Sequence, residues 1–89
     1  MKQRYLEVTY RKGHPLAAYL YLPRAVGARS VRTQEVSAGL LVDYSDSGDA
    51  IGLEILAPAL VTVAQVNAAL TILGLPTLTS EELAPLRAA

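Results

Sequence analysis

Residues 39–56 read GLLVDYSDSGDAIGLEIL, and this stretch decides the fold. Two runs that alternate between apolar and other side chains flank the segment SDSGD at 45–49, which has the composition of a tight turn. The pattern predicts a β-hairpin with one apolar face, and a shift of one residue would destroy that match. In the predicted register Ser45 pairs with Ala50, Tyr44 with Ile51, Asp43 with Gly52, Val42 with Leu53, Leu41 with Glu54 and Leu40 with Ile55.

Three further strands are expected before this hairpin. Residues 3–10 alternate, residues 17–23 form a second run that Pro23 ends, and residues 29–36 form a weaker, polar strand suited to a sheet edge. Residues 11–15 (RKGHP) are expected to form a loop between the first two strands.

The C-terminal third carries the boundary signals of a helix. Thr62 and Gln65 have the spacing of a capping box, Gly74 suits the left-handed position that ends a helix, and Pro76 prevents its continuation. The apolar stripe between these ends is expected to face the sheet, and it consists of Val63, Val66, Leu70 and Leu73.

A second capping box, Thr79 with Glu82, predicts a short terminal helix that Pro85 limits. The fold class is therefore α+β: an antiparallel sheet of four or five strands, a capped helix and a short terminal helix. We expect a single domain over residues 1–89, with the sheet in residues 1–57 and the helical region in residues 58–89.

Composition excludes several kinds of site. The chain of 89 residues has no cysteine and one histidine, which excludes a disulfide scaffold, a thiolate zinc site and a multi-histidine metal site within one chain. The start of the chain lacks the apolar region of a signal peptide, and Pro58, Gly74 and Pro76 interrupt the uncharged stretch 55–80. We therefore expect no membrane span and a cytoplasmic protein.

The net charge of zero conceals a division along the chain. Residues 1–34 hold seven basic residues and one acidic residue, and residues 35–89 hold one basic and seven acidic residues. Such a division is typical of a nucleic-acid patch, or of basic and acidic strands that neutralise each other across a sheet. The basic residues are spread singly, which favours neutralisation.

The hairpin at 39–56 resembles the motif of a small prokaryotic family, domain-of-unknown-function family twenty-two eighty-three. That motif reads G-h-h-V-D-x-D-x-x-G-x-h-h-G-h-E-h-h, where h is hydrophobic, and Asp43, Gly48, Gly52 and Glu54 occupy its fixed positions. The resemblance implies a small antiparallel β domain with no established activity. Some members accompany toxin-like genes, which implies a binding or neutralising partner.

The resemblance extends over residues 5–57. Thr9-Tyr10 followed by residues 18–22 (AYLYL) is similar to the first hairpin of the family. Arg11 and Leu16 stand where that family usually has acidic residues, so the resemblance does not extend to an acidic site there.

Asp43 and Glu54 are the candidate functional carboxylates. The predicted register makes them diagonal neighbours on one face, about 7–8 Å apart at the backbone. Such a pair is able to transfer protons or to hold a divalent cation. The alternative, which we favour, is that they form ion pairs with Arg29 or Arg32 of the adjoining strand.

Three tyrosines are predicted to share one sheet face, near two arginines. Aromatic sheet faces flanked by arginine stack single-stranded bases in some nucleic-acid-binding proteins. Cross-strand tyrosines also stabilise sheets in proteins without such a role, and we favour that explanation. The residues of this candidate nucleic-acid face are Arg4, Tyr5, Tyr19, Tyr21 and Arg24.

The back of the predicted helix carries Ala64, Ala68 and Ile72 and no charge, which predicts contact with the terminal segment or with a second subunit. With 52% hydrophobic residues, the chain is also unusually apolar for a small monomer. The sequence thus predicts a non-catalytic protein–protein interaction module that acts as a homo-oligomer, a dimer, or with a partner protein. The alternative is an antitoxin-like or nucleic-acid-binding regulatory protein, and the third hypothesis is an enzyme or metal site at Asp43 and Glu54. We expect no cofactor.

Overall fold

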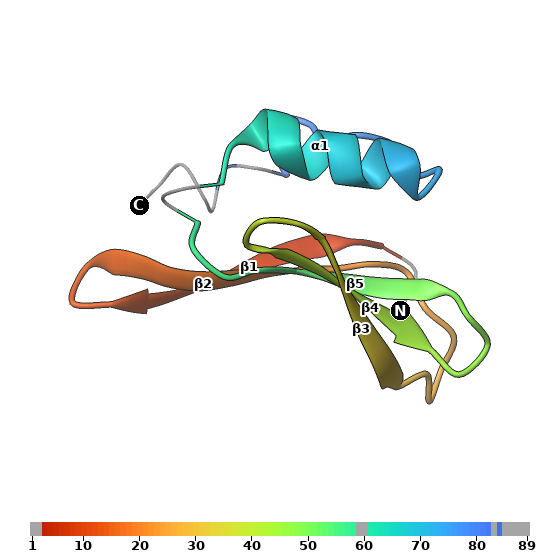
Figure 1. Cartoon of the computed structure of the whole chain (residues 1–89). Coiled ribbons are helices and arrows are strands. Elements are labelled where there is room, and N and C mark those ends of the chain that lie inside the picture. The colour runs from red at the N-terminus through yellow and green to blue at the C-terminus, as the bar shows by residue number, and fades with distance from the viewer. Residues whose placement is uncertain (1–2, 59–60, 83, 85–89) are drawn as a thin grey trace.

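One helix packs across a five-stranded antiparallel sheet in the computed structural model, which describes residues 3–58, 61–82 and 84 (Figure 1). The spatial order of the strands is β1-β2-β5-β4-β3, so the last strand in the chain is the central one. This arrangement confirms the α+β class, although little of the chain is helical. The elements are β1 (Tyr5–Arg11), β2 (His14–Tyr21), β3 (Ser30–Ser37), β4 (Leu40–Ser45), β5 (Ala50–Ile55) and α1 (Val63–Ile72).

The β4–β5 hairpin has the predicted register except at its tip. Pairing is as expected from Leu40 with Ile55 to Asp43 with Gly52. The predictions for Tyr44 and Ser45 are wrong, because Tyr44 takes Ala50 as its partner and a bulge is left at Ile51. The turn explains the shift: the Ser45 amide donates to the Asp49 carbonyl over 2.9 Å, which moves the pairing at the tip by one residue.

The β1–β2 hairpin is tighter and longer than predicted. In place of a loop over 11–15, only Lys12 and Gly13 connect the strands, with φ angles of 53° and 79°. Two left-handed residues form the kind of turn that suits the twist of a hairpin. β2 pairs with β5 only over Ala18–Tyr21, so residues 9–17 project beyond the sheet as a two-stranded arm (Figure 1). We call this segment the hairpin arm.

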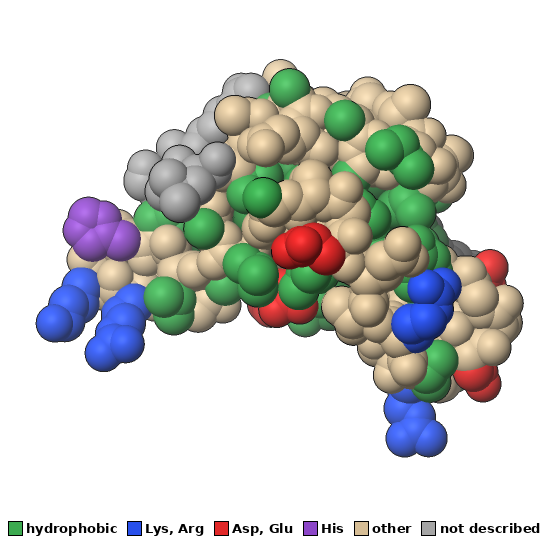
Figure 2. Space-filling model, in the orientation of Figure 1, with side chains coloured by type: hydrophobic (Ala, Val, Ile, Leu, Met, Phe, Trp, Pro, Cys, Tyr) green, Lys and Arg blue, Asp and Glu red, His purple; other side chains and the backbone are tan. Residues whose placement is uncertain are grey.

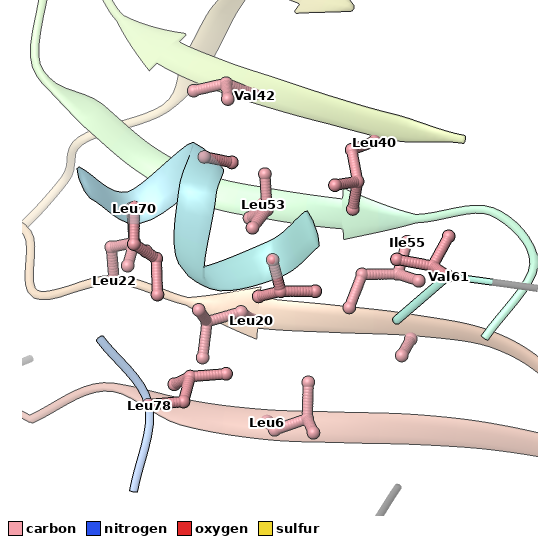
Figure 3. Close-up of a cluster of buried hydrophobic side chains, with 13 residues drawn as sticks. Leu6, Leu20, Leu22, Leu40, Val42, Leu53, Ile55, Val61, Leu70 and Leu78 are labelled. Carbon is pink, nitrogen blue, oxygen red and sulfur yellow. The ribbon is translucent and has the colours of Figure 1, made fainter. Parts of the chain in front are cut away.

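The core lies between α1 and one face of the sheet (Figure 3). Val66 and Leu70 of the predicted helix stripe are fully buried, and Val63 and Leu73 are partly buried against the same cluster. The fully buried side chains from the sheet side are Leu20, Leu22, Leu40, Val42, Ile51, Leu53 and Ile55.

Both ends of α1 form as predicted. The Gln65 amide donates to the Thr62 hydroxyl over 3.2 Å, and the Thr62 amide donates to the Gln65 side chain over 2.7 Å. At the other end Gly74 has a φ of 74°, and the Leu75 amide donates to the Leu70 carbonyl over 2.8 Å. These bonds satisfy backbone groups that a helix end leaves without partners.

The C-terminal segment returns along the side of α1. Leu78 is buried in the core, and its amide donates to the Asn67 side chain over 2.8 Å. The second capping box is formed by Thr79 and Glu82, whose backbone amides donate to each other's side chains. The terminal helix predicted from this box falls largely on residues 83 and 85–89, outside the described residues.

Candidate functional site

The helix covers one face of the sheet and leaves the other uncovered. Side chains alternate along each strand, so the residues between the buried ones lie on the uncovered side. We call this surface the open face, and it consists of two rows that cross all five strands. The first row is Tyr5, Tyr21, Gly52, Asp43 and Thr33; the second row is Glu7, Tyr19, Glu54, Leu41 and Glu35.

Asp43 is buried on this face by two hydroxyl groups. The Tyr19 hydroxyl donates to its Oδ2 atom over 2.6 Å, and the Thr33 hydroxyl donates to its Oδ1 atom over 2.5 Å. Asp43 is 9% exposed, and these two hydrogen bonds give each of its carboxylate oxygens a donor within the sheet. The expected ion pair of Asp43 with Arg29 or Arg32 is therefore not formed.

Arg32 has other contacts. Its guanidinium lies 4.2 Å from the centre of the Tyr44 ring and donates to the Gln34 side chain over 3.1 Å. Arg32 and Tyr44 are paired residues of β3 and β4, next to a bulge in β3, so the contact is a cross-strand cation–π interaction. We expected a carboxylate as the partner of Arg32. The bulge in β3 changes which residue of β4 lies beside Arg32, and sequence spacing does not reveal that bulge.

Tyr19 reaches Asp43 by lying across Gly52. A Cβ atom at position 52 would stand 1.8 Å from the Tyr19 hydroxyl oxygen, so a glycine is required under this ring. Burial, followed by the hydrogen bond to Asp43, raises the pKa of Tyr19 well above its usual value of 10.0, and Arg24 opposes the rise. Tyr19 therefore stays protonated over the physiological range and acts as a hydrogen-bond donor.

The three tyrosines share the open face, as predicted. The rings of Tyr5 and Tyr21 stack with centres 4.5 Å apart, and the rings of Tyr19 and Tyr21 lie 4.7 Å apart at a tilt. Arg24 lies 5.6 Å from the centre of the Tyr21 ring, within cation–π range. Tyr5 is 49% exposed, so the cluster offers an aromatic surface to a binding partner.

The structure separates Arg4 from this cluster. Its guanidinium donates to Glu82 over 2.6 Å and to the Thr77 carbonyl over 2.7 Å, and it also donates to the Pro76 carbonyl. Arg4 therefore ties β1 to the C-terminal segment, and of the two arginines expected beside the tyrosines only Arg24 is there. No local pattern indicates a pair of residues separated by 78 positions.

The charge of the open face is mainly negative. Glu7 and Glu35 are exposed at the ends of the second row, and Glu54 is half-buried between them. The Tyr21 hydroxyl lies 3.4 Å from Glu7. Within residues 3–58, 61–82 and 84, no three histidine, aspartate or glutamate side chains are grouped as a metal site requires.

The described residues leave the back of α1 uncovered. Ala64 and Ala68 are exposed and Ile72 is 78% exposed, so the described part of the terminal segment does not cover them. A shallow hollow of about 130 Å³ separates this surface from the end of β3 at Val36 and Ser37. The predicted contact of these residues with a second subunit stays a prediction.

A larger hollow of about 540 Å³, which we did not predict, lies at one end of the sheet. The β4–β5 turn, the segment after β2 and the end of α1 surround it. The side chains of the turn bind one another: Ser45 and Ser47 are 2.8 Å apart at their hydroxyl oxygens, and Ser47 donates to Asp49 over 3.1 Å. Arg24, which also lines the hollow, donates to the Ile51 carbonyl.

No helix among the described residues is long and apolar enough to cross a membrane. Comparison of the chain with family models, with curated proteins and with solved structures finds no match. The family resemblance of the hairpin therefore stays a prediction.

Proposed function

We propose that this chain is a non-catalytic protein-binding module whose open face receives the partner. The observation that carries the proposal is the stack of Tyr5, Tyr21 and Tyr19 on a sheet face that no element of the described residues covers. Tyrosine is enriched in protein interfaces because it supplies a large contact area with few rotatable bonds. These rings are already held by stacking and by the bond from Tyr19 to Asp43, which lowers the entropy lost on binding.

The charge of the face favours a protein partner over a nucleic acid. Glu7, Glu54 and Glu35 lie in one row beside the tyrosines. Carboxylates repel phosphate groups, whereas they attract the lysine and arginine side chains of a basic protein surface. An antitoxin-like or nucleic-acid-binding role accordingly ranks second, and an enzyme or metal site at Asp43 and Glu54 ranks third because Asp43 already accepts two hydroxyl donors.

The proposal includes self-association as a dimer, which the high apolar content of the chain supports. It also includes a cytoplasmic, prokaryotic setting, as the resemblance of residues 39–56 to the prokaryotic family implies.

Site-specific photo-crosslinking tests the proposal. A benzophenone side chain replaces Tyr5, which is exposed on the open face, and in a matched control replaces Ile72, which is exposed on the back of α1. We expect nuclease-resistant protein–protein adducts from position 5 after irradiation in cells, and few from position 72. Adducts only from position 72, or nuclease-sensitive adducts from position 5, would contradict the proposal.

A further inference from the structure

The hairpin arm is an exposed and basic part of the described chain. Arg11, Lys12 and His14 are exposed around its two-residue turn, and the segment 9–17 holds no acidic residue. Figure 2 shows Lys and Arg side chains at this projecting end, on the side away from the helix, and a histidine beside them. The arm therefore offers positive charge beyond the edge of the sheet.

The arm and the acidic row are adjacent on the same strands. Glu7 of β1 pairs with Tyr19, and the arm begins one row further along, where Thr9 pairs with Ala17. Glu7, Thr9 and Arg11 alternate onto the same side of β1. Each molecule thus carries a positive and a negative region on one surface, and its net charge is zero.

We propose that a second copy of this chain covers the β1–β2 part of the open face, with the basic arm of each copy on Glu7 and the neighbouring tyrosines of the other. Glu7 lies two residues before Thr9, and Arg11 lies two residues after it. A two-fold axis that passes over Thr9, in the plane between two facing sheets and perpendicular to β1, therefore places Arg11 of each copy opposite Glu7 of its partner. The same contact forms twice, as an isologous dimer requires.

An exposed aromatic side chain supports the same placement. Tyr5, which is 49% exposed, lies in the part of the face that the partner's arm covers. The overlap is two strands wide and extends over residues 5–13, so it measures about 10 Å by 30 Å. Two such surfaces bury on the order of 600 Å², which is typical of weak contacts, so we expect a dimer with a dissociation constant in the high micromolar range.

This inference rests on the proposed function, since it names the partner of the open face. The experiment is sedimentation velocity of the purified full chain over a concentration series, with two charge reversals, Glu7→Arg and Arg11→Glu. Each reversal alone opposes like charges twice, and we expect the dissociation constant to rise about tenfold or more. An equimolar mixture of the Glu7→Arg and Arg11→Glu proteins restores both attractions, so we expect it to dimerise as the wild type does.

The controls are Arg29→Glu and Glu81→Arg, which change exposed charges outside the open face and are expected to leave dimerisation unchanged. Neutral variants, Glu7→Gln and Arg11→Gln, replace any charge reversal that fails to fold. A monomeric wild type, or single reversals that dimerise normally, or a mixture that stays monomeric, would overturn the inference. A monomeric wild type with protein adducts at position 5 would overturn this inference alone, whereas loss of those adducts would overturn the proposed function as well.

Binding of nucleic acid by the basic arm is the alternative to the dimer, and a titration distinguishes the two. The wild type is titrated with mixed single-stranded RNA at low salt, with Arg11→Glu as the control. A monomeric wild type that binds this RNA through Arg11 would overturn the dimer. Absence of RNA binding by a dimeric wild type supports it.

Discussion

The Tyr19 hydroxyl donates to the Asp43 carboxylate over 2.6 Å, and in doing so it spans the glycine between them. Tyr19 belongs to β2 and Asp43 to β4, and these strands are not neighbours, because β5 separates them. The bond therefore joins the two halves of the sheet across its central strand. It also fixes one of the three rings on which the proposed binding surface depends.

Gly52→Ala is expected to lower the free energy of unfolding by about 1–3 kcal/mol, because the new methyl group occupies the space of the Tyr19 ring. Urea denaturation followed by circular dichroism measures the change. In the double variant with Tyr19→Ala the clash is absent, so the two effects should not add. A Gly52→Ala protein as stable as the wild type would show that the ring does not lie there.

The raised pKa of Tyr19 predicts a loss of stability at high pH. The unfolded side chain ionises near pH 10.0, whereas the folded one stays protonated at that pH because it is buried and donates to Asp43. The contribution of protonated Tyr19 to the free energy of unfolding should thus be complete below pH 10.0 and should decrease as the pH rises above it. Denaturation at several alkaline pH values measures this slope. The slope should be shallower in Tyr19→Phe, and an equal slope in both proteins would contradict the assignment.

The pair of Arg4 and Glu82 predicts a second pH dependence, on the acid side. The hydrogen bond from Arg4 lowers the pKa of Glu82 from 4.5 to about 2. A carboxylate whose pKa is lowered in the folded state stabilises the fold above pH 4.5, and this contribution is lost as the pH falls toward 2. Acid denaturation of Glu82→Gln, compared with the wild type, should lack this part of the loss. If the two proteins lose stability in parallel, the pair does not hold the C-terminal segment.

The two sides of α1 should respond differently to substitution. Leu70 is fully buried, so Leu70→Ala is expected to cost about 2–5 kcal/mol of unfolding free energy. Ala68 is exposed, so Ala68→Arg should leave the thermal melting temperature unchanged. Because we place the partner on the open face, Ala68→Arg should also keep the oligomeric state, which size-exclusion chromatography with light scattering measures. Dissociation by Ala68→Arg would instead assign the interface to the back of the helix.

Much of the fold could be predicted because the decisive signals are local. The register from Leu40 with Ile55 to Asp43 with Gly52 follows from matching two apolar faces, and the Thr62 capping box follows from a three-residue spacing. The bulge at Ile51 could not be predicted in the same way. It depends on how the turn closes at Ser45, and several closures fit the same turn residues.

The candidate site was predicted only in part, because its contacts are long-range. Alternation placed Tyr5, Tyr19 and Tyr21 on one face, and the structure brings them together. The partners of the charged groups were not predictable from spacing. Asp43 binds hydroxyl groups from β2 and β3, and Arg4 binds a segment from the other end of the chain.

The most direct test of the open face as the binding surface is an NMR dilution series of the wild-type protein. Amide shifts are recorded from low micromolar to millimolar concentration and assigned along the chain. We expect concentration-dependent changes at Tyr5, Glu7, Arg11 and Tyr19, with none at Ala68. Changes confined to the back of α1, around Ala68, would contradict the central claim.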